Sequence, residues 1–109
     1  MTDIEVLQRL QQVLAERRNA APDSSYVAGL YAKGTDGICK KVAEEAAEAI
    51  MAAKDGDKMH LVKEVTDLWF HSMVLLAHFG AGVEDVAAEF VRREGVSGIE
   101  EKKSRDIGS

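Results

Sequence analysis

Apolar residues recur along most of this chain at intervals of three and four, which is the period of an α-helix. A first helix is expected over about residues 3–18, because Thr2 and Glu5 have the spacing of a capping box and the apolar residues that follow are Ile4, Leu7, Leu10 and Leu14. Pro22 lies in a turn-forming segment that closes this helix and leaves Ser24 or Ser25 to cap the next one.

Glycines mark the ends of the elements that follow. Residues 25–32 predict a short helix or turn, and Gly34 and Gly37 separate it from a helix rich in alanine that continues to about Lys54. Gly56 suits the left-handed position after a helix, and Asp57 can cap the next one. So short a connection predicts two neighbouring antiparallel helices.

The longest apolar stretch, from Leu68 to Phe79, predicts a helix with apolar residues on nearly every side. We therefore expect other helices to surround it, some of them from a second subunit, since one small domain offers few. Another helix is expected from Val83 to about Glu94, and residues 95–109 are expected to form a polar, flexible tail. No alternation typical of strands is found, so the fold class is all-α: a bundle of about four to five helices, completed by dimerisation.

Composition narrows the classes of function. At 109 residues we expect one domain, 1–109. A formal net charge of −5 argues against nonspecific electrostatic binding of nucleic acid. Cys39 is the single cysteine, and the N-terminus lacks the pattern of a signal peptide. The apolar stretch is too short and too polar to span a membrane, so a cytoplasmic location is expected.

The polar feature that calls for explanation is a set of carboxylates inside apolar stretches. Glu44, Glu45 and Glu48 precede the Asp-Gly-Asp turn, and Glu64 and Asp67 follow it. Residues three or four apart share a helix face, so each set forms a patch that repels itself without a cation. The two patches are almost equally far from the turn, which brings them level across the hairpin.

Each carboxylate taken singly fits a solvated helix surface, with Lys41 as an ion-pair partner. Together the pairs favour a metal site, because Asp67 adjoins the apolar stretch and an unpaired charge near a core is costly. A ferritin-like di-iron site needs Glu-x-x-His pairs, which the sequence lacks, and zinc prefers Cys and His ligands. Oxygen ligands alone indicate Mg²⁺, with Mn²⁺ as the alternative, and Mg²⁺ commonly binds phosphates.

The pattern Glu44-Glu45-x-x-Glu48 followed by Glu64-x-x-Asp67 resembles the signature of the all-α nucleoside triphosphate pyrophosphohydrolases, the MazG-like group. Further segments, between about Asp23 and Arg105, are similar to the phosphoribosyl-ATP pyrophosphatase family. These segments are Ser25 to Ala28, Ala32 to Gly34, Lys40-Lys41, Asp67 to His71, Gly82 to Val86 and Ser97 to Arg105. Gly29, Tyr31 and Gly82 depart from the family pattern without touching the acidic signature.

The resemblance implies hydrolysis of phosphoribosyl-ATP to phosphoribosyl-AMP and pyrophosphate, the second step of histidine biosynthesis. It implies four ligands for Mg²⁺, namely Glu45, Glu48, Glu64 and Asp67, with Glu44 as an additional or alternative ligand. A glutamate among Glu44, Glu45 and Glu48 would orient or deprotonate the attacking water, and the spacing leaves open which one. The expected partners are this small-molecule substrate and a second copy of the chain.

Basic residues are candidates for the substrate phosphates: Lys33, Lys40, Lys41, Lys102 and Arg105. Lys40 and Lys41 are adjacent on a helix, so only one of them can face the site. Plain solvated side chains account equally well for Lys33 and the two tail residues. His71 lies one turn after Asp67, where it could orient that carboxylate or simply belong to the core.

Two other functions fit the same pattern. A house-cleaning hydrolase of the MazG-like group would use the same metal chemistry on a free or damaged nucleoside triphosphate. A helical interaction module would keep the fold without catalysis.

Overall fold

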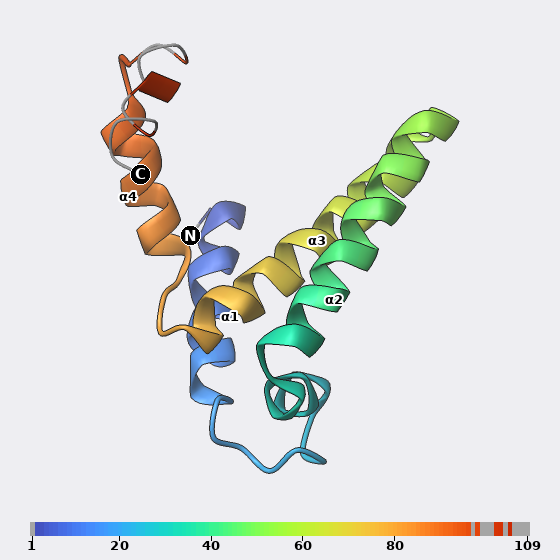
Figure 1. Cartoon of the computed structure of the whole chain (residues 1–109), viewed down its shortest axis with the longest axis vertical. Coiled ribbons are helices and arrows are strands. Elements are labelled where there is room, and N and C mark those ends of the chain that lie inside the picture. Colours follow the sequence, from blue (N-terminus) through green and yellow to red (C-terminus); the bar gives the residue numbers. More distant parts are fainter. Residues whose placement is uncertain (1, 97, 99–101, 104, 106–109) are drawn as a thin grey trace.

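The protein is all α-helical in the computed structural model, which describes residues 2–96, 98, 102–103 and 105. A 3₁₀ turn, Asp3–Glu5, leads into α1, and long helices α2 and α3 form a hairpin that α4 follows (Figure 1). The bounds of the helices are Val6–Glu16 for α1, Tyr26–Asp55 for α2, Lys58–His78 for α3 and Val83–Arg93 for α4. The described residues contain no strand, so the predicted all-α class is confirmed.

Polar caps and one left-handed glycine set the ends of the hairpin helices. The Ser25 hydroxyl accepts a hydrogen bond from the Ala28 amide at 3.1 Å, and the Asp57 carboxylate accepts one from the His60 amide at 3.1 Å. Gly56 has φ 74°, which only glycine adopts without strain. The predicted capping box at Thr2 is wrong, because the Thr2 side chain makes no capping hydrogen bond and the chain begins with the 3₁₀ turn instead.

The predicted break near Gly34 is a kink within α2. Gly34 has φ 75° and ψ −173°, so the helical path is interrupted at this residue and resumes at Thr35. The positive φ requires glycine here, because a Cβ would meet the following carbonyl. The segment before the kink thereby takes a different direction from the rest of α2 and packs its first residue against α3.

The core lies where α1 and the first part of α2 pack against the C-terminal half of α3. Its buried side chains come from all three helices: Leu14, Leu30, Tyr31, Ile38, Met73, Val74 and Ala77. Two buried polar groups find backbone partners in it: the Tyr31 hydroxyl donates to the Leu14 carbonyl at 2.7 Å, and the Gln11 amide donates to the Met73 carbonyl at 3.1 Å.

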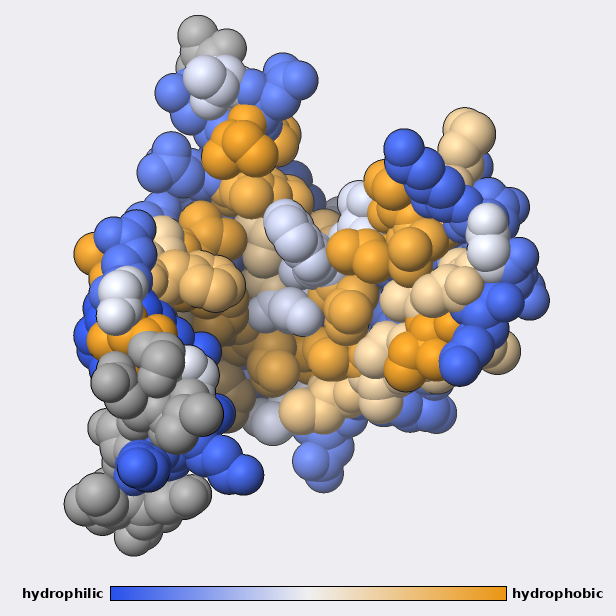
Figure 2. Space-filling model, turned by 90° about the horizontal axis from the view of Figure 1, so that it is seen from above, coloured by the Kyte–Doolittle hydropathy of each residue, from blue (hydrophilic) through white to orange (hydrophobic). Residues whose placement is uncertain are grey.

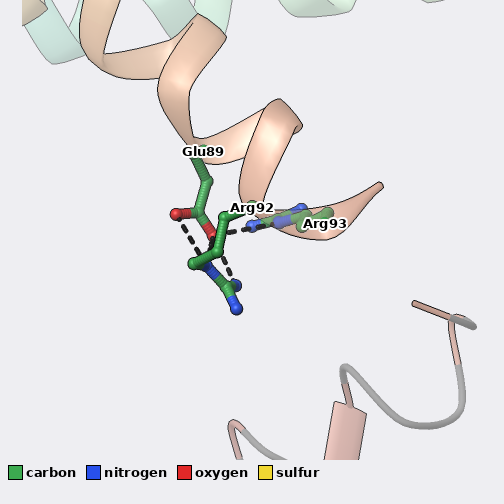
Figure 3. Close-up of polar contacts among 3 residues, drawn as sticks. All are labelled: Glu89, Arg92 and Arg93. Carbon is green, nitrogen blue, oxygen red and sulfur yellow. Dashed lines mark hydrogen bonds and ion pairs between the residues drawn. The ribbon is translucent and has the colours of Figure 1, made fainter. Parts of the chain in front are cut away.

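Charged pairs stabilise α4 along its own length. Asp85 accepts a hydrogen bond from the Gly82 amide at 2.9 Å at the start of the helix. In the last turns Glu89 contacts Arg92 at 2.6 Å and Arg93 at 3.1 Å (Figure 3). These hydrogen bonds, that to Arg92 first, lower the pKa of Glu89 to about 2. The helix keeps its shape although it makes few contacts with the other helices.

The single chain leaves its apolar stretch only half covered. Trp69 is 55 % exposed and Phe79 is 69 % exposed, so helices of the same chain do not surround the stretch as expected. The molecule exposes 7839 Å², whereas a compact monomer of this mass exposes about 6,000 Å². Its radius of gyration, 16.1 Å, also exceeds the roughly 13 Å of a compact domain of this length. None of the described helices is both long and apolar enough to cross a bilayer.

Candidate metal centre

The hairpin brings carboxylates of α2 and α3 together. Glu48 and Glu64 lie eight residues before and eight residues after Gly56, so an antiparallel pair of helices places them opposite each other. Glu45, one turn before Glu48, completes the group: each of the three side chains offers a carboxylate oxygen, and these oxygens lie within 4.8 Å of one another. We call these three residues the acidic cluster.

Two oxygens of the acidic cluster are buried and unsatisfied. Glu45 is 7 % exposed, and the Glu64 side chain is 15 % exposed. Neither Oε2 of Glu45 nor Oε2 of Glu64 has a hydrogen-bond partner within the described part of the chain. Burying a carboxylate oxygen without a partner is costly, so both atoms need a ligand that the protein does not supply.

Glu48 and Glu64 lie close enough to repel each other when both are charged. The neighbouring Glu48 carboxylate is the largest of the effects that raise the pKa of Glu64, and burial acts in the same direction. The protein thus holds two carboxylates closer than their charges favour. A cation between them removes this repulsion.

The donor set fits a divalent cation that prefers oxygen. The acidic cluster provides carboxylates alone, which suits Mg²⁺ or Mn²⁺ better than zinc. The orphaned oxygens of Glu45 and Glu64 are atoms that such an ion would satisfy. The residues present therefore fit the metal that the sequence pattern predicts.

Lys41 and Glu44 lie beside the acidic cluster without belonging to it. The Lys41 ammonium is 3.4 Å from Glu44 and 3.7 Å from Glu45, so it links the two glutamates. Glu44 is more exposed than Glu45, with 44 % of its side chain accessible. Of the two adjacent lysines, Lys41 is the one that faces the carboxylates.

Asp67 and His71 extend the same face of α3, but not as the sequence suggested. Asp67 is exposed and lies outside the acidic cluster. The His71 ring donates from Nδ1 to the backbone carbonyl of Asp67 at 2.8 Å, so the expected hydrogen bond to its carboxylate is not formed. Nε2 of His71 instead lies 2.8 Å from the hydroxyl of Tyr26.

His60 is a contact of the cluster that sequence reasoning missed. Its Nε2 lies 3.2 Å from Oε1 of Glu64, one turn away on α3. One Glu64 oxygen is thus taken by the imidazole while the other, Oε2, is the buried and unpartnered one. The spacing of four residues between His60 and Glu64 was a signal that could have revealed this pair.

The remaining predicted substrate residues lie apart from the cluster. Lys33 and Lys40 are exposed on α2, and neither has a contact with the three glutamates. Lys102 and Arg105 are exposed and follow α4, which lies across the molecule from the α2/α3 turn in Figure 1. Within one chain the fold therefore brings Lys41, but not the tail residues, to the carboxylates.

Comparison with known proteins identifies the family. The model of the family described as phosphoribosyl-ATP pyrophosphohydrolase matches residues 7–94. The chain belongs to this family. Proteins named phosphoribosyl-ATP pyrophosphatase are 76 % identical in Azoarcus sp. (strain BH72), 74 % in Aromatoleum aromaticum and 61 % in Chromobacterium violaceum. The alignments cover 96, 98 and 93 % of this chain and 98, 99 and 94 % of those proteins, in the same order.

The match to the phosphoribosyl-ATP pyrophosphohydrolase family includes the carboxylates on both sides of the turn between α2 and α3. Residues 7–94 span α1 to α4 almost completely, so the region of similarity contains the acidic cluster, Lys41 and Asp67. The resemblance seen in the sequence is confirmed, and the fold brings three residues of its acidic motif together, namely Glu45, Glu48 and Glu64.

Proposed function

We propose that this protein hydrolyses phosphoribosyl-ATP to phosphoribosyl-AMP and pyrophosphate, the second step of histidine biosynthesis. Its close similarity to proteins named phosphoribosyl-ATP pyrophosphatase supports this assignment. The structural observation that best supports this assignment is the acidic cluster, in which two buried carboxylate oxygens have no partner among the described residues and could bind a cation. A site of this kind binds a phosphate-rich substrate through Mg²⁺.

The ligands of Mg²⁺ in this proposal are the acidic cluster and, on the next turn of α3, Asp67. Glu45, Glu48 and Glu64 are already gathered, whereas Asp67 is exposed and follows Glu64 by three residues. His60 holds one oxygen of Glu64 and so directs the other toward the cluster. Mn²⁺ is expected to substitute, because the donor set is the same.

The reaction splits the bond between the α-phosphorus and the oxygen that bridges to the β-phosphorus. When bound, Mg²⁺ supplies positive charge against the phosphate oxygens as pyrophosphate departs. Glu44 lies beside the acidic cluster without belonging to it and pairs with Lys41, so we assign it to orient the attacking water and accept its proton. Lys41 is placed to neutralise a phosphate oxygen, with Lys33 and Lys40 further along α2.

A dimer is part of the proposal. Two adjoining hollows of about 470 and 540 Å³ share Leu7, Trp69 and Met73, and Figure 2 shows apolar side chains gathered in the hollow between the two sides of the molecule. A second copy packed there would cover the excess apolar surface of the chain. In such a dimer, Lys102 and Arg105 of one subunit could reach the acidic cluster of the other. A cytoplasmic location is proposed with this pathway.

An assay of pyrophosphate release tests the substrate. Phosphoribosyl-ATP should be hydrolysed in the presence of Mg²⁺, and EDTA should abolish the reaction. ATP and deoxynucleoside triphosphates are the comparison substrates. Preference for a deoxynucleotide would replace this assignment by the house-cleaning function, and no metal-dependent release from any of them would favour the interaction module.

A further inference from the structure

Tyr26, the first residue of α2, presents an exposed aromatic ring that is nevertheless held firmly. Its hydroxyl lies 2.8 Å from Nε2 of His71, and its ring stacks on Phe70 with 6.5 Å between centroids and 27° between planes. The residue is 57 % exposed in spite of these two contacts. An aromatic ring fixed at a surface in this way is suited to bind a flat ligand.

The direction of the hydrogen bond follows from His71. Nδ1 of His71 is 2.8 Å from the carbonyl of Asp67, which can only accept, so Nδ1 carries the proton. In the neutral ring Nε2 then accepts, and the Tyr26 hydroxyl is the donor. The tyrosine oxygen is left with lone pairs toward solvent, where it can accept a hydrogen bond from an N–H or O–H group of a ligand.

Tyr26 contacts α3 at His71, which lies on the same face of that helix as Glu64. His71 follows Glu64 by seven residues, so it lies on the same face of α3 at a distance of about 10 Å. Both places are formed by α2 and α3: Tyr26 meets His71 at one, and the acidic cluster lies at the other, where Lys41 pairs with Glu44 and Glu45. A separation of this size suits a nucleotide, whose base and phosphates lie at opposite ends of the ribose.

We propose that Tyr26 binds the purine base of the nucleotide whose phosphates bind at the acidic cluster, with His71 and Phe70 as positioning residues for its ring. The ring stacks on the base, and the hydroxyl oxygen accepts a hydrogen bond from the nucleoside. This inference rests on the proposed function, since it assumes a nucleotide at the acidic cluster.

A purely structural role for Tyr26 predicts something different. If the hydroxyl only anchored the start of α2, its removal would lower stability and leave substrate affinity unchanged. Tyr31 provides the matched control, because it is 9 % exposed and its hydroxyl donates to the Leu14 carbonyl at 2.7 Å within the core. Tyr31→Phe should lower the Tm by a few degrees and leave the KM unchanged.

Steady-state kinetics with phosphoribosyl-ATP and saturating Mg²⁺ separate these cases. Tyr26→Ala should raise the KM about tenfold, the size of a lost base-stacking contact, and change kcat by less than about threefold. Tyr26→Phe keeps the ring and should raise the KM less. His71→Gln retains an acceptor for the hydroxyl and should stay near wild type, whereas His71→Leu should behave like Tyr26→Phe. An unchanged KM in Tyr26→Ala would overturn the inference.

A binding measurement keeps this test independent of turnover. Wild-type protein that hydrolyses no phosphoribosyl-ATP would contradict the proposed function alone, and calorimetric titration with AMP in Mg²⁺ then decides the role of Tyr26. Weaker AMP binding by Tyr26→Ala, with the affinity for inorganic pyrophosphate unchanged, supports it. Equal affinity for AMP in both proteins, or no AMP binding by the wild type, would overturn it.

Discussion

The two faces of α3 both lack partners, but of different kinds. One face holds Glu64 in the acidic cluster, with two buried carboxylate oxygens unsatisfied within the described chain. Trp69, five residues further and so about 140° around the helix, lies on the other face among apolar neighbours, 55 % exposed. On the first face, carboxylate oxygens that carry negative charge are buried. On the second face, apolar side chains are exposed to water.

The difference indicates what each face should bind. Carboxylates that repel each other are stabilised by a cation and by the phosphates that the cation brings. Exposed apolar surface is stabilised by being removed from water, and a second copy of the chain offers a matching surface. One helix thus carries the site on one side and the proposed subunit contact on the other.

The largest effect is expected from breaking the charged face. Glu48→Gln removes a metal ligand and should lower kcat/KM at least about 100-fold, while circular dichroism shows an unchanged helical spectrum. Glu16→Gln on α1 is the control, an exposed glutamate outside the site. Wild-type turnover by Glu48→Gln would refute the metal centre.

The apolar face is tested by Trp69→Glu. A charge in the shared hollow should shift a dimer toward monomer by about 100-fold or more in Kd, measured by sedimentation equilibrium. Phe79→Ala is the control, since Phe79 directly follows α3 and is 69 % exposed but does not line either hollow. A monomeric wild-type protein at micromolar concentration would count against the dimer.

A smaller loss is expected when support for the charged face is removed. His60→Ala frees Glu64 from its hydrogen bond and should weaken Mg²⁺ binding about tenfold, as measured by calorimetry. Met59→Ala, a change at an exposed neighbour, should have no such effect. Equal Mg²⁺ affinities in the two variants would show that His60 does not position Glu64.

The smallest effect concerns the protein without metal. The folded-state pKa of Glu64 is raised, so its charged form is disfavoured in the native state, and the stability of the chelated protein should fall as pH rises above about 4.5. Glu64→Gln removes this dependence and should raise the Tm of the chelated protein by about 2 °C at neutral pH. A thermal melt in EDTA at two pH values measures it. A lower Tm for the variant at neutral pH would mean that repulsion does not govern this site.

Local signals predicted the helices well. Gly56 and Asp57 end and begin helices where the sequence indicated, since a left-handed glycine and a capping carboxylate act on the nearest backbone groups. Thr2 failed as a cap because a 3₁₀ turn precedes α1. The roles of Asp67 and His71 were harder to foresee, because the His71 ring found a hydroxyl on another helix segment and a backbone carbonyl.

The sequence by itself determined the all-α class, the antiparallel hairpin and the meeting of Glu48 with Glu64. Helical periodicity and the short connection of Gly56 and Asp57 fix these features within one stretch of chain. Only the tertiary structure decided which oxygens are buried without partners, that His60 holds Glu64, and that Tyr26 reaches His71 across 45 residues. Burial and long-range contacts depend on how helices pack, and the kink at Gly34 directs that packing in a way that spacing alone does not specify.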